Sequence, residues 1–126
     1  MRGILDTSAV LASGVEPIPG ELALSAITLA ELHVGVLVAK TPDIRAERLR
    51  RLVQIEREFD ALPVDDDVAD GYGRLAPAVV LEGRNPPARS MDLLIAATAY
   101  THGARLYTRN PSDFVGLADF IDVVAV

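Results

Sequence analysis

The chain of 126 residues contains no cysteine. A disulfide framework and a zinc site built on thiolates are therefore both excluded, and this composition fits a reducing cytosol. Long apolar runs are also missing, since stretches such as 36–39 fall far below the ~18–20 residues that a membrane span needs. Asp6 interrupts the N-terminus and leaves no room for a secretory signal. We therefore expect a soluble, cytoplasmic protein with no membrane association.

Several catalytic motifs are absent as well. No Gly-rich loop followed by Lys and Ser or Thr is present, which argues against an NTPase. No Gly-x-Gly-x-x-Gly run supports a dinucleotide site, and no Gly-x-Ser-x-Gly elbow supports a hydrolase triad. The histidines, His33 and His102, are scattered along the chain, so a histidine-based ribonuclease has little support.

The net charge is acidic. A formal charge of -6 argues at first against a nucleic-acid partner. Divalent cations bound by some of the acids would reverse the local sign, and arginines gather within 45–57 and 84–109. The charge balance therefore neither requires nor excludes RNA, but it argues against tight non-specific binding.

The organisation along the chain predicts one α/β domain over residues 1–126, because half of the residues are apolar and short apolar runs alternate with helical patterns. The expected strands cover 3–6, 22–26, 61–64, 105–108 and 120–124. The expected helices cover 7–12, 28–39, 43–58, 66–81 and 90–102. The strands are nearly continuous in apolar character, which predicts helices on both faces of a parallel sheet.

Four acidic residues each stand where an apolar segment gives way to a loop or helix: Asp6, Glu31, Asp92 and Asp113. The carboxyl ends of parallel strands share one sheet edge, where open α/β sheets bind ligands. Four carboxylates at one point repel one another unless a cation lies among them. Their hard oxygens suit Mg²⁺ or Mn²⁺. The pattern therefore predicts metal-dependent phosphate chemistry at these residues.

Each acid also has a purely structural explanation, as a strand-end turn, a capping box or an acid in a first helical turn. The capping residues would be Thr28 before Glu31, Ser90 before Asp92 and Asn110 before Asp113. The four acids together favour the metal site, because every one follows an apolar segment that leads to the same sheet edge. Capping and metal binding are also compatible, since a carboxylate in a first helical turn is held in place.

Other charged residues receive structural interpretations. The acidic run 65–67 and Asp70 are expected to stabilise a helix N-terminus. Glu47 has the spacing for surface ion pairs with Arg50 and Arg51. The helix 43–58 is expected to carry an apolar face, made of Ile44, Leu49, Leu52, Val53 and Phe59 near its end.

Polar residues beside the four acids are candidates for supporting roles. Thr7, Ser8, Thr108 and Asn110 are placed to hold a ligand carboxylate or a water at the metal. Arg89 and Arg109 are the candidates for phosphate contacts, whereas Arg84 is interpreted more simply as surface charge.

Four motifs follow one another along the chain: ILDTSA at 4–9, TLAEL at 28–32 followed by Gly35, DLLIAATA at 92–99 and TRNPSDF at 108–114. In this order they resemble the PIN-domain ribonucleases, and more closely the VapC toxins of bacterial and archaeal toxin–antitoxin pairs. Each motif is weak alone, but the four in order are specific, and the resemblance covers essentially the whole chain.

The resemblance implies a PIN-like three-layer α/β sandwich, with a five-stranded parallel sheet in the order 3-2-1-4-5 flanked by helices. It implies endonucleolytic cleavage of RNA with Mg²⁺ or Mn²⁺ as the cofactor. The family's catalytic and metal-binding quartet falls on Asp6, Glu31, Asp92 and Asp113. VapC-type proteins usually form homodimers and are held inactive by a cognate antitoxin, so both partners are expected here.

Metal-assisted hydrolysis predicts products with 3′-hydroxyl and 5′-phosphate ends. Two alternatives stay open. The chain could be a non-catalytic binding module of the same fold that acts through protein partners. A phosphatase or phosphoacceptor domain is disfavoured, because Asp6 is followed by Thr7, Ser8 and Ala9 where a paired aspartate would be expected. The RNA target, the antitoxin, the number of metal ions and the dimer surface are not encoded in any motif.

Overall fold

A computed structural model describes residues 2–126, apart from the side chain of Pro87. The elements, in chain order, are β1 (Arg2–Leu5), α1 (Thr7–Leu11), β2 (Glu21–Ser25), α2 (Ala26–Leu37), α3 (Pro42–Glu58), β3 (Asp60–Leu62), α4 (Asp66–Leu81), the 3₁₀ helix η1 (Pro86–Arg89), α5 (Ser90–Thr101), β4 (Arg105–Thr108), the 3₁₀ helix η2 (Pro111–Phe114) and β5 (Val123–Ala125). No helix within 2–126 has the length and apolar character needed to cross a membrane.

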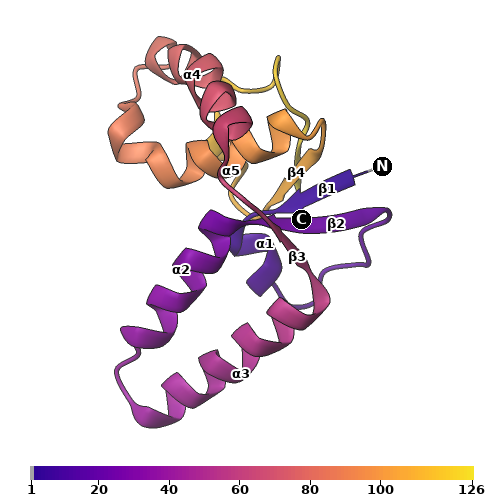
Figure 1. Ribbon diagram of the computed structural model, residues 1–126, viewed down its shortest axis with the longest axis vertical. Helices are drawn as coiled ribbons and strands as arrows, with labels where there is room; N and C mark the ends of the chain where they lie inside the picture. Colours follow the sequence, from indigo (N-terminus) through magenta and orange to yellow (C-terminus); the bar gives the residue numbers. More distant parts are fainter. Residues whose placement is uncertain (1) are drawn as a thin grey trace.

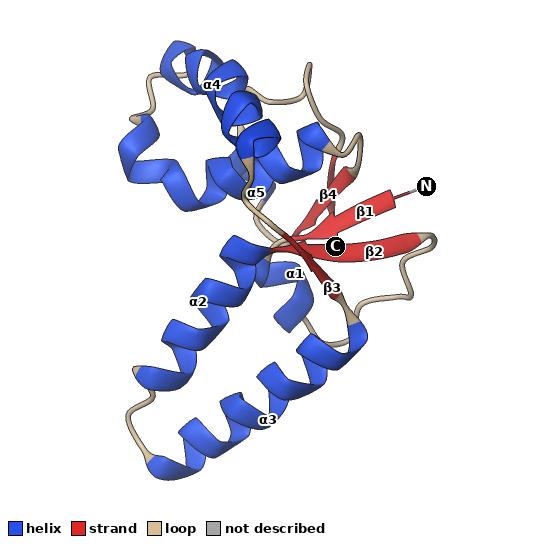
Figure 2. Ribbon diagram, viewed as in Figure 1, coloured by secondary structure: helices blue, strands red, loops and turns tan. Residues whose placement is uncertain are grey.

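The strands form a parallel five-stranded sheet in the order β3-β2-β1-β4-β5 (Figure 2). β1 is central, and its Gly3 pairs with Leu22 of β2 on one side and Arg105 of β4 on the other. The expected strand order is confirmed. Because all pairs are parallel, the carboxyl ends of the strands lie at one edge of the sheet.

Alternate residues of the central strands point into two separate cores. Ile4 and Leu106 belong to the core under α4 and α5, whereas Leu5 and Leu24 belong to the core under α1, α2 and α3. Figure 1 shows these two groups of helices on opposite sides of the sheet. Successive strand residues face opposite ways, so a strand covered on both faces must be apolar throughout. The prediction of helices on both faces is confirmed.

The helix α5 is the most deeply buried element of the first core. Leu93, Ile95 and the alanines at 96, 97 and 99 are each at most 2% exposed. A helix that is apolar on nearly all sides is stable only when other elements surround it. The α4 helix approaches α5 closely at Gly71, where an added Cβ would lie 2.9 Å from Thr101 Oγ1. This contact joins α4 to the C-terminal part of α5, the helix whose first turn carries Asp92.

The α2–α3 hairpin corrects one expectation. Only Leu52 and Ile55 of α3 are buried, whereas Ile44, Leu49 and Val53 are 38%, 49% and 39% exposed. The predicted apolar face is thus only partly covered. The reason is tertiary: α2 and α3 extend beyond the sheet, so the first half of α3 has no sheet surface beneath it (Figure 1).

The expected ion pairs of Glu47 with Arg50 and Arg51 are also wrong for the described residues. The four salt bridges there join Arg74 to Asp70, Arg89 to Asp92 and to Asp113, and Arg105 to Asp122. Arg51 Nη2 instead donates to the Val10 carbonyl at 3.1 Å. This contact ties α3 to the end of α1, which α3 reaches only in the folded chain.

Three expected helix caps, at Thr28, Ser90 and Asn110, are wrong, and the acidic cap of α4 is confirmed. α2 starts at Ala26 with Ser25 as its N-cap, so Thr28 lies inside the helix and forms no capping box with Glu31. The predicted start at residue 28 was late because the apolar end of β2 runs directly into the helix. Asp65 caps α4 by accepting from Val68 N at 3.0 Å, as expected. Asp6 caps α1, although the sequence suggested only a strand-end turn as its structural role.

The caps expected at Ser90 and Asn110 are not formed. α5 continues directly from η1, with Arg89 at the N-cap position and no side-chain capping bond. Asn110 precedes η2 without a side-chain cap. Asp92 and Asp113 are therefore in first helical turns, as predicted, but the residues before them do not hold those turns.

Candidate functional site

The four acids gather at the carboxyl edge of the sheet. Asp6 directly follows β1, Glu31 lies on α2 after β2, Asp92 is in the first turn of α5, and Asp113 is in η2 after β4. Burial raises the pKa of Asp92, and the nearby carboxylates of Asp113, Glu31 and Asp6 raise it further, while Arg89 lowers it. The acids are thus close enough to act on one another electrostatically.

The carboxylates are not already arranged as a metal cage. Within the described part of the chain, no three histidine, aspartate or glutamate side chains form a group that could hold a metal ion as they stand. The structure therefore brings the predicted acids to one edge, and closing them around an ion requires movement of side chains.

Asp6 is the most firmly held of the four, and it is only 6% exposed. Its Oδ1 accepts from Ala9 N at 2.9 Å and from Ser8 Oγ at 2.6 Å. Its Oδ2 accepts from Thr108 Oγ1 at 2.5 Å. A buried carboxylate needs such partners, because desolvation without them is costly. Asp6 thus caps α1 and faces the site at the same time.

Glu31 is held through α1. Thr7 Oγ1 donates to Glu31 Oε1 at 2.7 Å and lies 3.5 Å from Thr28 Oγ1. The turn that follows Asp6 therefore supports the second carboxylate as well as the first. Glu31 also lies on the wall of a groove between α1, α2 and α3.

Asp92 and Asp113 are held far more loosely. Arg89 Nη1 lies 3.7 Å from Asp92 Oδ2 and 3.5 Å from Asp113 Oδ1. The three side chains are between 32% and 39% exposed. Charge-assisted hydrogen bonds of strong geometry are ~2.7–2.9 Å long, so these contacts are weak and open to water.

The other predicted supporting residues divide into two kinds. Thr7, Ser8 and Thr108 contact the acids through their side chains, as expected. Asn110 contributes its backbone N–H, which donates to Thr108 Oγ1 at 3.0 Å. Arg109 similarly donates its backbone N–H to Ser8 Oγ at 2.9 Å, and its side chain is exposed. Their roles toward a metal or a phosphate stay predictions.

Sequence reasoning missed a layer of buried hydroxyls near the acids. Ser25, Thr28 and Thr98 are fully buried. Thr98 Oγ1 donates to Leu94 O at 2.9 Å and to Ser25 Oγ at 3.3 Å, which joins α5 to the end of β2. A polar residue within an otherwise apolar segment was the signal, since such a residue needs a partner when it is buried.

Arg84 has a role that its interpretation as surface charge did not capture. Its Nη2 donates to Ser112 O at 2.8 Å, directly before Asp113. Arg84, Arg89, Asp92 and Asp113 also line one small pocket. Arg84 thus fastens the loop after α4 to η2 and helps to place Asp113.

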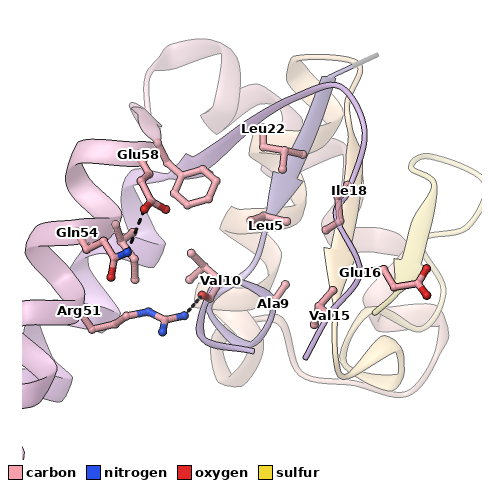
Figure 3. Close-up of a pocket in the computed structure, with 12 residues that line it drawn as sticks. Leu5, Ala9, Val10, Val15, Glu16, Ile18, Leu22, Arg51, Gln54 and Glu58 are labelled. Carbon is pink, nitrogen blue, oxygen red and sulfur yellow. Dashed lines mark hydrogen bonds between the residues drawn. The ribbon is translucent and has the colours of Figure 1, made fainter. Parts of the chain in front are cut away.

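Two grooves border the other side of the site. The first leads away from the acids between α1, α2 and α3, and its wall is made of Thr7, Leu11, Glu31, Leu32, Gly35, Arg48, Arg51 and Leu52. The second lies between α3 and the segment before β2 (Figure 3), where Arg51 reaches Val10 and Gln54 reaches Glu58. None of the four acids lines the second groove. Arg51 borders both grooves.

The comparisons agree with this fold. The family model described as "PIN domain" matches residues 4–118, which defines the class of protein. Ribonuclease VapC5 of Mycobacterium tuberculosis is 40% identical, over 98% of this chain and 95% of the relative. Ribonuclease VapC4 of the same organism is 31% identical, over 84% and 78% of the two chains.

Solved structures are similar over almost the full length, and one of them is described as a member of the VapBC family of toxin–antitoxin systems. VapBC-5 from Mycobacterium tuberculosis superposes with a TM-score of 0.84 at 39% identity, covering 99% of this chain and 97% of the other. FitAcB from Neisseria gonorrhoeae gives 0.76 at 31% identity, covering 98% and 96%. The chain therefore belongs to the VapC family of PIN-domain ribonucleases, the toxins of VapBC toxin–antitoxin systems.

Proposed function

We propose that residues 1–126 act as one PIN domain that cleaves RNA endonucleolytically with Mg²⁺ or Mn²⁺ held by Asp6, Glu31, Asp92 and Asp113. The observation that carries the proposal is the gathering of these carboxylates, strong enough that three of them raise the pKa of the fourth. Without a cation, the mutual repulsion of these carboxylates destabilises the folded protein. Neutralising Asp92 would relieve that repulsion.

The residues fit a hard divalent cation. The four acids offer only carboxylate oxygens, the ligand type that Mg²⁺ and Mn²⁺ prefer. The side chains of Asp92 and Asp113 are 32% and 35% exposed and have room to move, whereas Asp6 is buried and fixed. We infer that the Asp6 carboxylate keeps its position when the cation binds, and that the other carboxylates move toward it.

The chain's own residues would then divide the work. A bound divalent cation supplies neutralisation of charge on a phosphodiester and a nucleophilic water near neutral pH. Thr108, Ser8 and the Ala9 N–H hold the Asp6 side chain in place, because each donates a hydrogen bond to one of its carboxylate oxygens. Arg89 and Arg109 are the candidates for contacts to RNA phosphates. The expected products carry 3′-hydroxyl and 5′-phosphate ends.

The antitoxin is proposed to occupy the groove between α1, α2 and α3. Leu11, Leu32 and Leu52 make this groove apolar, and Glu31 stands in its wall. An amphipathic helix can lay its apolar face in such a groove, and a basic side chain at its end can reach the acids. The neighbouring groove in Figure 3 is a natural continuation, since Arg51 borders both.

A homodimer is proposed through an apolar surface formed by the end of α4, the start of α5 and the residue after η2. Val80, Leu81, Met91 and Val115 are 57%, 87%, 50% and 39% exposed. They come from adjoining segments, since Glu82 packs against Gly116 and η1 joins α4 to α5. Large exposed apolar side chains that adjoin one another are typical of interaction surfaces. Light scattering of the toxin with Leu81→Asp tests this: the dimer should dissociate.

The first experiment is cleavage of total cellular RNA by antitoxin-free protein in Mn²⁺ or Mg²⁺, with and without EDTA. Asp92→Asn is compared with Asp70→Asn, which removes an exposed acid on α4 that pairs with Arg74. We expect discrete products that disappear in EDTA and in Asp92→Asn but persist in Asp70→Asn. Equal activity of Asp92→Asn would point to a contaminating nuclease. Products with 2′,3′-cyclic phosphate ends would contradict the proposed chemistry.

A further inference from the structure

We propose that Arg89 is a displaceable internal cation, whose guanidinium holds Asp92 and Asp113 in the metal-free protein and leaves them when Mg²⁺ or Mn²⁺ binds. The inference rests on the proposed function and adds a positioning residue to the same site. It implies that the chain carries its own competitor for the metal, attached to the segment that leads into α5.

The contact geometry places one atom between two carboxylates. The same nitrogen, Arg89 Nη1, lies 3.7 Å from Asp92 Oδ2 and 3.5 Å from Asp113 Oδ1. Asp92 belongs to α5 and Asp113 to η2, so this nitrogen links two elements that are distant in sequence. A metal shared by these two acids would also have to lie between them. The guanidinium and the ion therefore compete for one place.

The contacts are loose enough to be broken. Both are longer than a strong charge-assisted hydrogen bond of ~2.7–2.9 Å. The Arg89 side chain is 39% exposed, so water can replace its partners when it moves away. Arg89 is the last residue of the short helix η1 and the N-cap residue of α5. Its side chain makes no capping hydrogen bond to that helix, so no such bond has to break when the side chain moves.

No other described arginine at this edge could take the same place. Arg84 is fastened to the Ser112 carbonyl at 2.8 Å and makes no ion pair with the acids among the described residues. Arg109 is exposed and joins the site through its backbone N–H. Arg89 is thus the residue that competes with the metal for the carboxylates. Once it has moved away from them, its guanidinium can contact a phosphate of the RNA.

Competition has a measurable consequence. A guanidinium and a divalent ion that share the same carboxylates repel, and each lowers the affinity for the other by the same factor. Removing the charge of Arg89 should tighten metal binding about tenfold, the size expected for charges a few ångströms apart in a partly exposed site.

The test is Mn²⁺ binding by titration calorimetry of the antitoxin-free toxin, without RNA. We compare wild type with Arg89→Gln, with Arg89→Lys, which keeps the charge, and with Arg74→Gln, a matched loss of an exposed arginine on α4. Arg89→Gln should bind Mn²⁺ about tenfold more tightly. Arg89→Lys and Arg74→Gln should bind within about twofold of wild type.

The results separate the two proposals. If wild type binds Mn²⁺ and Arg89→Gln binds equally or more weakly, the internal cation is overturned while the metal site stands. If Arg74→Gln tightens binding as much as Arg89→Gln, the effect is one of net charge and the inference is again overturned. If neither wild type nor Arg89→Gln binds Mn²⁺, the metal site proposed above fails and the inference fails with it. Binding by Arg89→Gln alone would support the inference in its strongest form.

Discussion

The two halves of the acidic site differ in how they are held. Asp6 and Glu31 accept hydrogen bonds of 2.5–2.9 Å from hydroxyls and a backbone N–H, whereas Asp92 and Asp113 share one guanidinium nitrogen at 3.5–3.7 Å. Asp6 and Glu31 are therefore in place before any ion binds. Asp92 and Asp113 are held by the Arg89 guanidinium, which can move away. In the proposed metal site, Asp6 and Glu31 would keep their positions when an ion binds, whereas Asp92 and Asp113 would move toward it.

The difference follows from the elements that carry each half. Asp6 caps α1 between β1 and the end of β4, where parallel pairing fixes the backbone on both sides. Asp113 lies in the 3₁₀ helix η2, and Asp92 in a helix start without a side-chain cap. Short 3₁₀ segments and uncapped starts leave their side chains freer to move.

The largest predicted effect is a difference between Asp6→Asn and Asp113→Asn. Asp6→Asn should reduce RNA cleavage on the order of 10³-fold, because it removes the fixed carboxylate and turns an amide N–H₂ toward hydroxyl donors. Asp113→Asn should cost about 10–100-fold, since its half of the site can readjust. Single-turnover cleavage in saturating Mn²⁺ measures both. Equal losses would remove the distinction between the two halves.

Thr108→Val probes the half of the site formed by Asp6 and Glu31 without touching an acid. It deletes the hydroxyl that donates to Asp6 Oδ2 and accepts from Asn110 N. The unfolding free energy should fall by about 1–3 kcal/mol, because a buried carboxylate and a backbone N–H both lose a partner.

The matched control is Thr101→Val, whose hydroxyl donates to Asp67 O at 3.2 Å in an exposed position. It should change stability by less than ~0.5 kcal/mol. Urea unfolding of both variants provides the comparison. A Thr108→Val protein as stable as this control would mean that Asp6 does not depend on its hydroxyl partners.

Arg84→Met probes the half of the site formed by Asp92 and Asp113. The change keeps much of the apolar stem but removes the bond to Ser112 O, so η2 and Asp113 should become more mobile. The Mn²⁺ concentration for half-maximal cleavage should rise a few-fold, less than the loss from any acid, in line with indirect support of a ligand. Arg74→Met is the control. An unchanged metal requirement would show that the Ser112 contact does not position Asp113.

The smallest effect is the pH dependence of metal-free stability. Burial and the neighbouring acids raise the pKa of Asp92 in the folded state, so the folded chain holds this proton more tightly than the unfolded chain. The contribution of Asp92 to the free energy of unfolding is therefore most favourable at a pH below the ordinary pKa of the group. It is lost as the pH rises through the raised pKa of the folded state.

Asp92→Asn should remove this loss and make the metal-free protein more stable than wild type at neutral pH. Urea unfolding of both proteins in EDTA, at intervals from about pH 4 to pH 7, measures the difference between the curves. A variant that is less stable than wild type at neutral pH would contradict the raised pKa.

The regular patterns of the sequence were sufficient to predict the main architecture. Short apolar runs between longer helical patterns predicted a parallel sheet covered on both faces, and the resemblance to the PIN-domain ribonucleases implied the strand order β3-β2-β1-β4-β5 that the structure has. The placement of Asp6, Glu31, Asp92 and Asp113 at one edge followed from the same logic, because parallel strands end together. The parallel sheet and the shared edge of the acids depend on local periodicity and on chain direction, which a sequence carries in full.

Other features were decided only by tertiary structure. The contacts of Arg51 to Val10 and of Arg84 to Ser112 join residues that no local spacing relates, and the exposure of Leu49 depends on which elements pack over α3. The position of Arg89 between two carboxylates belongs to the same class, since Asp92 and Asp113 meet only when α5 and η2 pack together. Side-chain partners at long range depend on how elements pack in space. The sequence by itself therefore determined which acids share an edge, and the folded chain decided how firmly each one is held.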